Sequence, residues 1–206
     1  RDRDRRGHPM TYTATGCRVE PYDGELRRWL GATDHYLGNP PPGALFAVVV
    51  RSLVPGLMGD LVPAGERVGV CVVGRPVARK LPQDGSVGEV VRMWLAPGLE
   101  FGTASHVLRV AGEVAASRGM VALIAYHDRT RHTGCIYRKA GFKKDGATAP
   151  KTLGWGSRAG RASGAYEATP KRRWCLDLTL TATGCRGVGL TPDPVQPWTR
   201  RRRSSS

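Results

Sequence analysis

The sequence predicts a single α/β domain in which a mixed, mostly antiparallel sheet is flanked by helices. Three observations support this fold class. The chain has 206 residues, which is enough for one ordinary domain with tails. Apolar runs of strand length alternate with segments whose apolar residues recur every three or four positions. The hydrophobic fraction of 40% can fill a core, which excludes a wholly disordered chain.

The two ends of the chain differ in composition from its body. Residues 1–18 begin with a charged run that has no hydrophobic periodicity. Residues 181–206 are rich in turn formers and end in four arginines and three serines. We therefore expect two disordered tails around a domain that spans 19–180.

The first half of the domain is expected to contain one helix and two strands. Leu26 and Leu30 are four positions apart and predict a helix over 19–30. The runs 44–50 and 67–73 are continuously apolar and are joined by a loop rich in proline and glycine. They are therefore predicted to be neighbouring antiparallel strands.

A strand, a loop and a helix follow in the middle of the chain. Residues 89–95 form the next predicted strand, and small residues fill the loop 99–105. The helix expected over 105–118 carries apolar residues at one face, namely Val107, Val110, Ala111, Val114 and Ala115. Residues 120–126 then read as a buried strand. A small-residue loop before a helix N-terminus is a ready anion site, because unpaired amides and the helix dipole point toward it.

The charge of the chain is strongly positive. The sequence has 32 Lys and Arg against 17 Asp and Glu, a formal net charge of +15. Of these, 17 basic and 5 acidic residues lie in 127–206, so most of the excess is in the C-terminal part. This pattern favours a polyanionic partner. The alternative is the coding bias of a GC-rich genome, which encodes arginine freely.

Two motifs in this middle region resemble the GNAT acyltransferase superfamily. In that family a strand ends in a splayed bulge, and the next loop wraps the pyrophosphate of acetyl-CoA before a helix begins. Residues 89–97, 101–104 and 105–118 are similar to that strand, loop and helix. Tyr137–Phe142 matches the family's Tyr-x-x-x-Gly-Phe motif. The resemblance covers 19–178 and implies a sheet whose central strands part to admit a CoA-type cofactor.

The resemblance also implies which residues hold the cofactor, acetyl-CoA or a related acyl-CoA. The implied set lies on the strand end, the loop and the helix start: Leu95, Gly102, Thr103, Ala104 and Ser105. The sequence departs from the family near Leu99, where the loop's usual basic or amide residue is replaced.

A narrower resemblance concerns the acceptor. Segments 68–79, 155–161 and 171–174 look like a GNAT subgroup found on phages and related mobile elements. That subgroup is similar to Mom proteins, which modify adenine bases in phage DNA and protect it from restriction. The implied function is acyl-CoA-dependent modification of a nucleic-acid base. The alternatives are N-acetylation of a small amine or a protein N-terminus, and a non-catalytic basic DNA-binding role.

Acyl transfer to an amine needs a base for the amine and an acid for the leaving thiolate. The position of Tyr137 in its motif implies that it is the acid, whereas the alternative is a tyrosine that packs under a helix. Glu89 is a candidate base, although a glutamate at a strand end is often simply solvated. His35 is a second candidate, because the adjacent Asp34 could raise the basicity of its imidazole.

Basic and aromatic residues alternate between 138 and 174, a composition that can hold phosphates and stack an exposed base. The stacking candidates are Trp155 and Trp174. The expected nucleic-acid contacts are Trp155, Arg158, Arg161, Lys171, Arg172 and Arg173. The alternative is that the tryptophans cap the core and the arginines form a solvated face.

A metal site and a membrane location are both disfavoured. His127, Asp128 and His132 have a spacing that suggests a metal site, but Arg129 and Arg131 lie between them, so a solvent-exposed basic loop is expected.

The cysteines are scattered and odd in number, which suits a reducing compartment. No apolar run approaches the roughly 20 residues that span a bilayer. We therefore expect a soluble, cytoplasmic protein that requires no metal. Its oligomeric state is left open.

Overall fold

The computed structural model describes residues 15–35, 38–52, 65–148 and 169–179. These residues form one seven-stranded sheet in the order β1-β2-β3-β4-β5-β7-β6. The strands are β1 (Thr15–Glu20), β2 (Phe46–Ser52), β3 (Arg67–Gly74), β4 (Val87–Leu95), β5 (Ala122–Asp128), β6 (Lys143–Thr148) and β7 (Lys171–Asp177). Only β4 and β5 pair in parallel, and every other pairing is antiparallel. The predicted mixed, mostly antiparallel sheet is confirmed.

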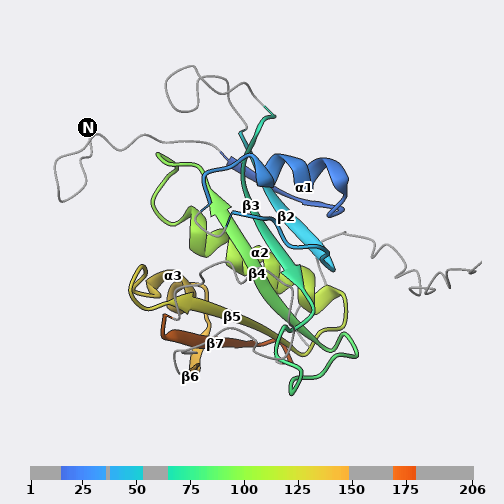
Figure 1. Ribbon diagram of the computed structural model, residues 1–206, viewed down its shortest axis with the longest axis vertical. Coiled ribbons are helices and arrows are strands. Elements are labelled where there is room, and N and C mark those ends of the chain that lie inside the picture. The colour runs from blue at the N-terminus through green and yellow to red at the C-terminus, as the bar shows by residue number, and fades with distance from the viewer. Residues whose placement is uncertain (1–14, 36–37, 53–64, 149–168, 180–206) are drawn as a thin grey trace, which may run out of the picture.

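Helices cover both faces of the sheet (Figure 1). α1 (Gly24–Gly31) lies on one face and α2 (Thr103–Ser117) on the other, while the short α3 (Cys135–Lys139) lies beside β5. β2 is covered on both faces, so it is apolar throughout and its alternate residues enter two separate cores. Val48 and Val50 pack in the α2 core, and Ala47 and Val49 pack in the α1 core. Among the described residues, no helix combines the length and apolar character needed to cross a membrane.

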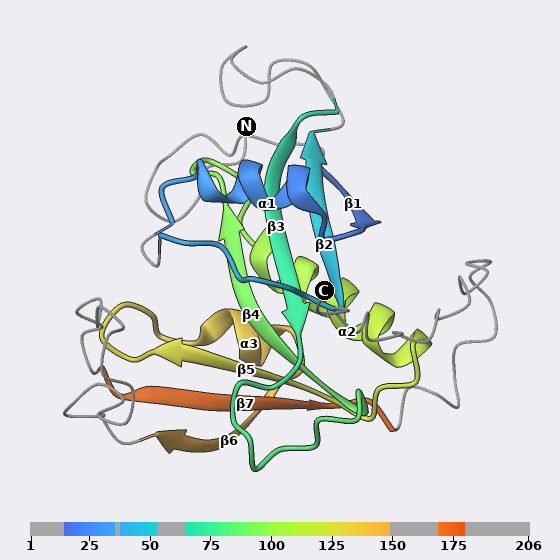
Figure 2. The same cartoon turned by 45° about the vertical axis from the view of Figure 1, so that its right-hand side comes forward.

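The two parallel strands separate along their length. Residues 87–90 of β4 pair with 122–125 of β5, and the pairing stops there although both strands continue. Figure 2 shows the two strands starting together at one corner of the sheet and diverging into a V. The implied parting of the central strands is therefore confirmed.

A β-bulge in β4 coincides with the separation. Val90 lies opposite Val73 of β3, whereas Arg92 lies opposite the preceding residue, Val72. Val91 is thus an extra residue in β4. A bulge bends its strand and increases the local twist, which turns the end of β4 away from β5.

The N-terminal boundary of the domain and the first helix differ from expectation. Residues 15–18, expected in the tail, and residues 19–20, expected in the helix, together form β1. The helix begins only after Asp23, whose carboxylate accepts a hydrogen bond from the Leu26 N–H at 2.9 Å. The leucine spacing located the helix correctly, but only its cap marks where it begins.

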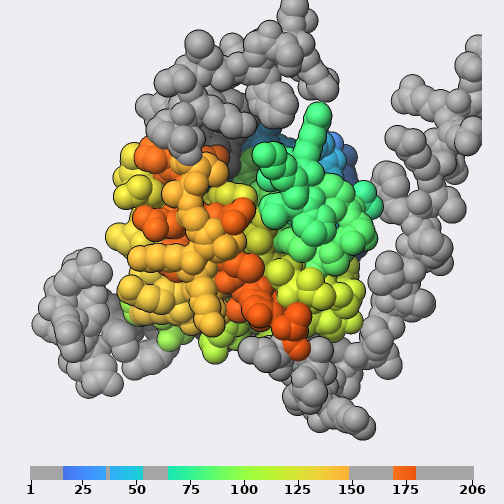
Figure 3. Space-filling model, turned by 90° about the horizontal axis from the view of Figure 1, so that it is seen from below, coloured from blue at the N-terminus to red at the C-terminus, as the bar shows by residue number. Residues whose placement is uncertain are grey.

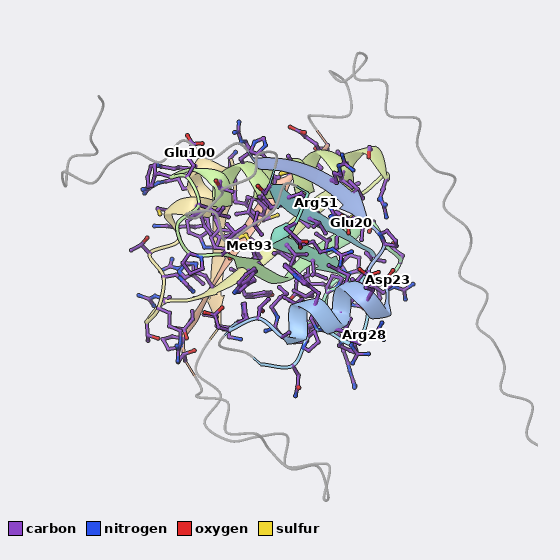
Figure 4. The ribbon with its side chains drawn as sticks, turned by 90° about the horizontal axis from the view of Figure 1, so that it is seen from above. Glu20, Asp23, Arg28, Arg51, Met93 and Glu100 are labelled. Carbon is purple, nitrogen blue, oxygen red and sulfur yellow. The ribbon has the colours of Figure 1, made fainter. Side chains whose placement is uncertain are left out.

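A half-buried carboxylate joins the edge strand β1 to β2 and β3. Glu20 accepts from Arg51 at 2.7 Å and pairs with Arg67 at 3.1 Å, and Figure 4 shows Glu20 beside Arg51. The two guanidinium groups outweigh desolvation and lower the pKa of the Glu20 carboxyl. Hydrophobic alternation alone did not predict this strand, since much of it is small or polar.

Candidate active site

A pocket of about 230 Å³ lies where β4 turns away from β5, and we call it the α2 pocket. Its lining comes from the end of β4, the following loop, the start of α2 and α3: Leu95, Ala96, 98–105, Cys135, Ile136 and Lys139. All five residues implied for the cofactor, Leu95, Gly102, Thr103, Ala104 and Ser105, are in this set. The structure therefore brings them together around one cavity.

Backbone amides of α2 are left available at this pocket. Gly102 is the N-cap, with φ 107°, and no side chain caps the helix. The Thr103 hydroxyl donates to the Glu100 carbonyl and the Ser105 hydroxyl donates to the Gly102 carbonyl, each at 2.8 Å. The Thr103 N–H also donates to the Glu100 carbonyl, at 3.1 Å. Because the Thr103 and Ser105 hydroxyls bond to carbonyls, they do not occupy the next amides of the first turn, those of Ala104 and Ser105, which point toward the helix N-terminus and can bind an anion.

A lysine supplies positive charge to the α2 pocket from α3. Lys139 lines the pocket and its Nζ lies 4.1 Å from the centre of the Phe101 ring. Phe101 itself is 82% exposed. Sequence reasoning missed Lys139, although it lies inside the Tyr137–Phe142 motif. Lys139 and Leu99 both line this pocket.

Tyr137 lies within α3 and is buried among rings. Its ring stacks on Trp174 at 5.7 Å and on His127 at 5.8 Å, and it meets Phe142 edge-on at 5.9 Å. It does not line the α2 pocket, whereas its neighbours Cys135 and Ile136 do. The packing role of this tyrosine is thus visible in the structure, and its catalytic role stays a prediction.

Trp174 and His127 are also buried, contrary to expectation. Trp174 is 3% exposed and donates from Nε1 to His127 Nδ1 at 2.6 Å, so its ring is not available to stack a base. His127 and Asp128 belong to β5 rather than to an exposed loop, although Arg129 and His132 are exposed as expected. The cause is strand length, since β5 continues past the apolar run to Asp128. Among the described residues, no three metal-ligating side chains converge.

Glu89 is a buried carboxyl rather than a solvated strand end. It is the third residue of β4, in the paired part of the V, and is 7% exposed. Its Oε2 accepts a hydrogen bond from the Val77 N–H at 2.8 Å. Burial raises the pKa of the Glu89 carboxyl, because desolvation disfavours the charged form.

His35 has a different electrostatic setting from the one predicted. Its Nδ1 accepts from Arg92 Nη1 at 2.8 Å, and Asp34 accepts from Trp94 Nε1 at 2.7 Å. Burial, then the Arg92 charge, lower the pKa of His35 to about 4 and outweigh the effect of Asp34. Asp34 does raise the pKa of His35, in the expected direction, but its effect is smaller than those of burial and Arg92, so the imidazole is less basic than a free one.

A second pocket, of about 240 Å³, lies at the ends of β5, β6 and β7, and we call it the basic pocket. It is lined by His127, Arg129, His132, Thr133, Lys144, Arg172 and Trp174. Arg172 is the one predicted nucleic-acid contact in this lining. Arg173 instead pairs with Asp145 at 2.8 Å, and Lys171 is exposed at the start of β7.

The remaining nucleic-acid predictions, Trp155, Arg158 and Arg161, lie outside the described residues.

Comparison of the sequence with protein-family models and with curated proteins finds no match. Solved structures do match. A chimera of the Vibrio cholerae spermidine N-acetyltransferase with hSSAT aligns with a TM-score of 0.54 and 10% identity, covering 80% of this chain and 96% of that one. The Vibrio cholerae spermidine/spermine N-acetyltransferase in complex with manganese ions also gives 0.54, at 9% identity over 81% and 95%.

An IAA acetyltransferase from Bacillus cereus aligns with a TM-score of 0.50 and 14% identity, covering 80% of this chain and 99% of that one. At such low identities the likeness establishes the fold alone. The chain has the fold of the GNAT N-acetyltransferases over most of its length.

Proposed function

We propose that this protein is an acyl-CoA-dependent N-acyltransferase whose acceptor is a nucleic-acid base. The observation that carries the proposal is the α2 pocket at the β4–β5 separation. A bulged strand, a parted sheet and an uncapped helix N-terminus meet there, on a fold shared with known N-acetyltransferases.

The α2 pocket suits the pyrophosphate of an acyl-CoA. The amides of Ala104 and Ser105 at the start of α2 and the helix dipole favour an anion by about 0.3–2 kcal/mol. Gly102 leaves open space beside the backbone, since a Cβ built there would have no atom within 4 Å. Lys139 adds the nearby positive charge. Bound acyl-CoA supplies an activated acyl carbonyl for attack by an amine.

Two described residues have the properties of the acid and the base. In the proposal, Glu89 takes up the amine proton through water, and its raised pKa brings it nearer the operating pH. Tyr137 gives the proton of its hydroxyl to the thiolate that leaves when the acyl carbon–sulfur bond breaks. His35 is the weaker base candidate, because its pKa of about 4 leaves a neutral imidazole with little proton affinity at pH 7.

The charge of the chain favours an anionic acceptor. A net charge of +15 and a pocket lined by Arg129, Lys144 and Arg172 repel a polycation such as spermidine, the substrate named for two of the matched structures. A nucleic acid is a polyanion, so the same positive charge attracts it. This charge supports the DNA-base acceptor implied by the resemblance to phage Mom-like proteins.

The test is mass spectrometry of nucleosides digested from the DNA of cells that express the chain, with Tyr137→Phe as the matched control. A new nucleoside that appears with the parent and disappears in the control is expected, and its mass identifies the transferred group. Calorimetry with CoA on both proteins establishes cofactor binding separately.

Two results would contradict the proposal in different ways. Unchanged DNA from a folded protein that binds CoA would refute the nucleic-acid acceptor and favour a small amine or a protein N-terminus. Absence of CoA binding would refute acyl transfer itself and favour a non-catalytic DNA-binding role.

A further inference from the structure

The basic pocket is a separate site with its own chemistry. We propose that it binds a phosphate group through Arg129, Lys144 and Arg172. Its lining shares no residue with the α2 pocket, and Gly134 lies between Thr133 of one and Cys135 of the other. The inference goes beyond acyl transfer and does not depend on it.

The three cations come from different parts of the chain. Arg129 follows β5, Lys144 is in β6 and Arg172 is in β7, whose neighbour in the sheet is β5 on one side and β6 on the other. None of them takes part in an ion pair between described residues. Three like charges around one cavity raise the energy of the empty pocket, and an anion would lower it.

The two carboxylates that neighbour pocket residues in the sequence, Asp128 and Asp145, have partners of their own. Asp128 accepts from the Thr130 N–H and hydroxyl at 2.8 and 2.6 Å and faces Arg131 at 3.6 Å. Asp145 pairs with Arg173 at 2.8 Å. Among the described residues that line the pocket there is no carboxylate, so the positive charge of its lining exceeds the negative charge.

The floor of the pocket adds neutral hydrogen-bond donors. Because His127 Nδ1 accepts from Trp174, the proton of the neutral imidazole is on Nε2, which is then a donor. Burial lowers the pKa of His127 and keeps it neutral. Thr133 adds a hydroxyl to the lining. Donors of this kind, with guanidinium and ammonium groups, are the usual partners of phosphate oxygens.

The size of the pocket also suits this ligand. Its volume of about 240 Å³ is several times the roughly 30 Å³ that one water molecule occupies. Figure 3 shows that β6 and β7 form the surface at this side of the molecule. A phosphate group can therefore reach the pocket as part of an extended single-stranded oligonucleotide or of a small molecule.

The test uses the full chain and a fluorescent single-stranded oligothymidylate of about 12 nucleotides, without acyl-CoA. The pocket variant is Lys144→Gln/Arg172→Gln. The control is Arg27→Gln/Arg28→Gln, which removes the same charge from exposed positions on α1. Arg28 is labelled in Figure 4. Circular dichroism establishes that both variants fold.

The pocket variant is expected to bind about tenfold more weakly, with a slope of log affinity against log salt that is lower by about 0.7–1.4. The control is expected to stay within about twofold of the parent. Equal losses in the two variants, or no loss in the pocket variant, would overturn the proposal.

A competition series distinguishes the sources of the phosphate. Displacement of the oligonucleotide by thymidine 5′-monophosphate, but not by thymidine, would indicate a phosphate monoester. Displacement only by unlabelled oligothymidylate would indicate the phosphodiester backbone. Displacement by thymidine as effectively as by its monophosphate would show that phosphate is not recognised and would overturn the proposal.

Discussion

The α2 pocket and the basic pocket are lined by residues on either side of Gly134 in the sequence, Cys135 and Thr133, and they are built from different groups. The α2 pocket consists mainly of small residues and backbone amides, with one lysine at its side. The basic pocket consists of long cationic side chains over buried rings. The first site is built into a local strand–loop–helix unit, while the second requires three strands to pair in the right register.

Gly134, between Thr133 of the basic pocket and Cys135 of the α2 pocket in the sequence, is expected to be the most sensitive position. Gly134 has φ 76°, and a Cβ there would lie 2.6 Å from both His127 and Trp174. Gly134→Ala is expected to lower the free energy of unfolding by about 2–4 kcal/mol, from backbone strain and overpacking together. Urea denaturation measures the loss.

Gly119→Ala is the matched control. Gly119 has φ 78° but open space around its Cβ position, so strain alone should cost about 1 kcal/mol. Similar losses at the two glycines would show that Gly134 does not close against the rings.

A negative charge at the start of α2 should have opposite effects on the stability of the fold and on the affinity for CoA. Ala104→Asp places a carboxylate in the first turn, where the helix dipole stabilises it by about 0.3–1 kcal/mol. The same charge repels the phosphates of CoA, and CoA affinity is expected to fall about tenfold to a hundredfold in calorimetry. Ala104→Asn has the same size without the charge. Equal CoA affinity of the two variants would refute the α2 pocket as the pyrophosphate site.

Acid should weaken the fold through two histidines, the half-buried His35 and the buried His127. Their folded pKa values are lowered, to about 4 for His35, below the roughly 6.5 of an unfolded imidazole. As the pH falls through that interval the unfolded state binds more protons, so the free energy of unfolding decreases.

His35→Asn/His127→Asn should make this decrease smaller by about 1–2 kcal/mol between about pH 7 and pH 4.5. Urea denaturation at the two pH values measures the difference. A variant that loses as much stability as the parent would contradict the lowered pKa values.

The smallest effect is expected from the single lysine of the α2 pocket. Lys139→Ala removes one cation and its contact with Phe101, and CoA affinity should fall about threefold with stability within about 0.5 kcal/mol. Calorimetry at two salt concentrations checks this, since the loss should shrink at higher salt. A loss as large as that of Ala104→Asp would mean that side chains rather than the backbone dominate this pocket.

Sequence reasoning succeeded where the residues of a site are contiguous in the chain and failed where their partners are distant. Residues 95–105 are contiguous, so their order in the chain already placed them together, and the structure brings all five implied cofactor residues to one pocket. The partner of His35 is 57 positions away, at Arg92, and no local pattern indicates it. The burial of Glu89 likewise depends on the contact with Val77 from the preceding loop.

By itself, the sequence determined the central strands and α2, because continuous apolar runs and a helical period are local properties that survive without tertiary contacts. It did not predict β6 and β7, whose strands mix lysine, arginine and small residues. Those strands form because they pair with β5 and with each other. Only that tertiary pairing brings Arg129, Lys144 and Arg172 around one cavity, since register between distant segments is set by the whole sheet.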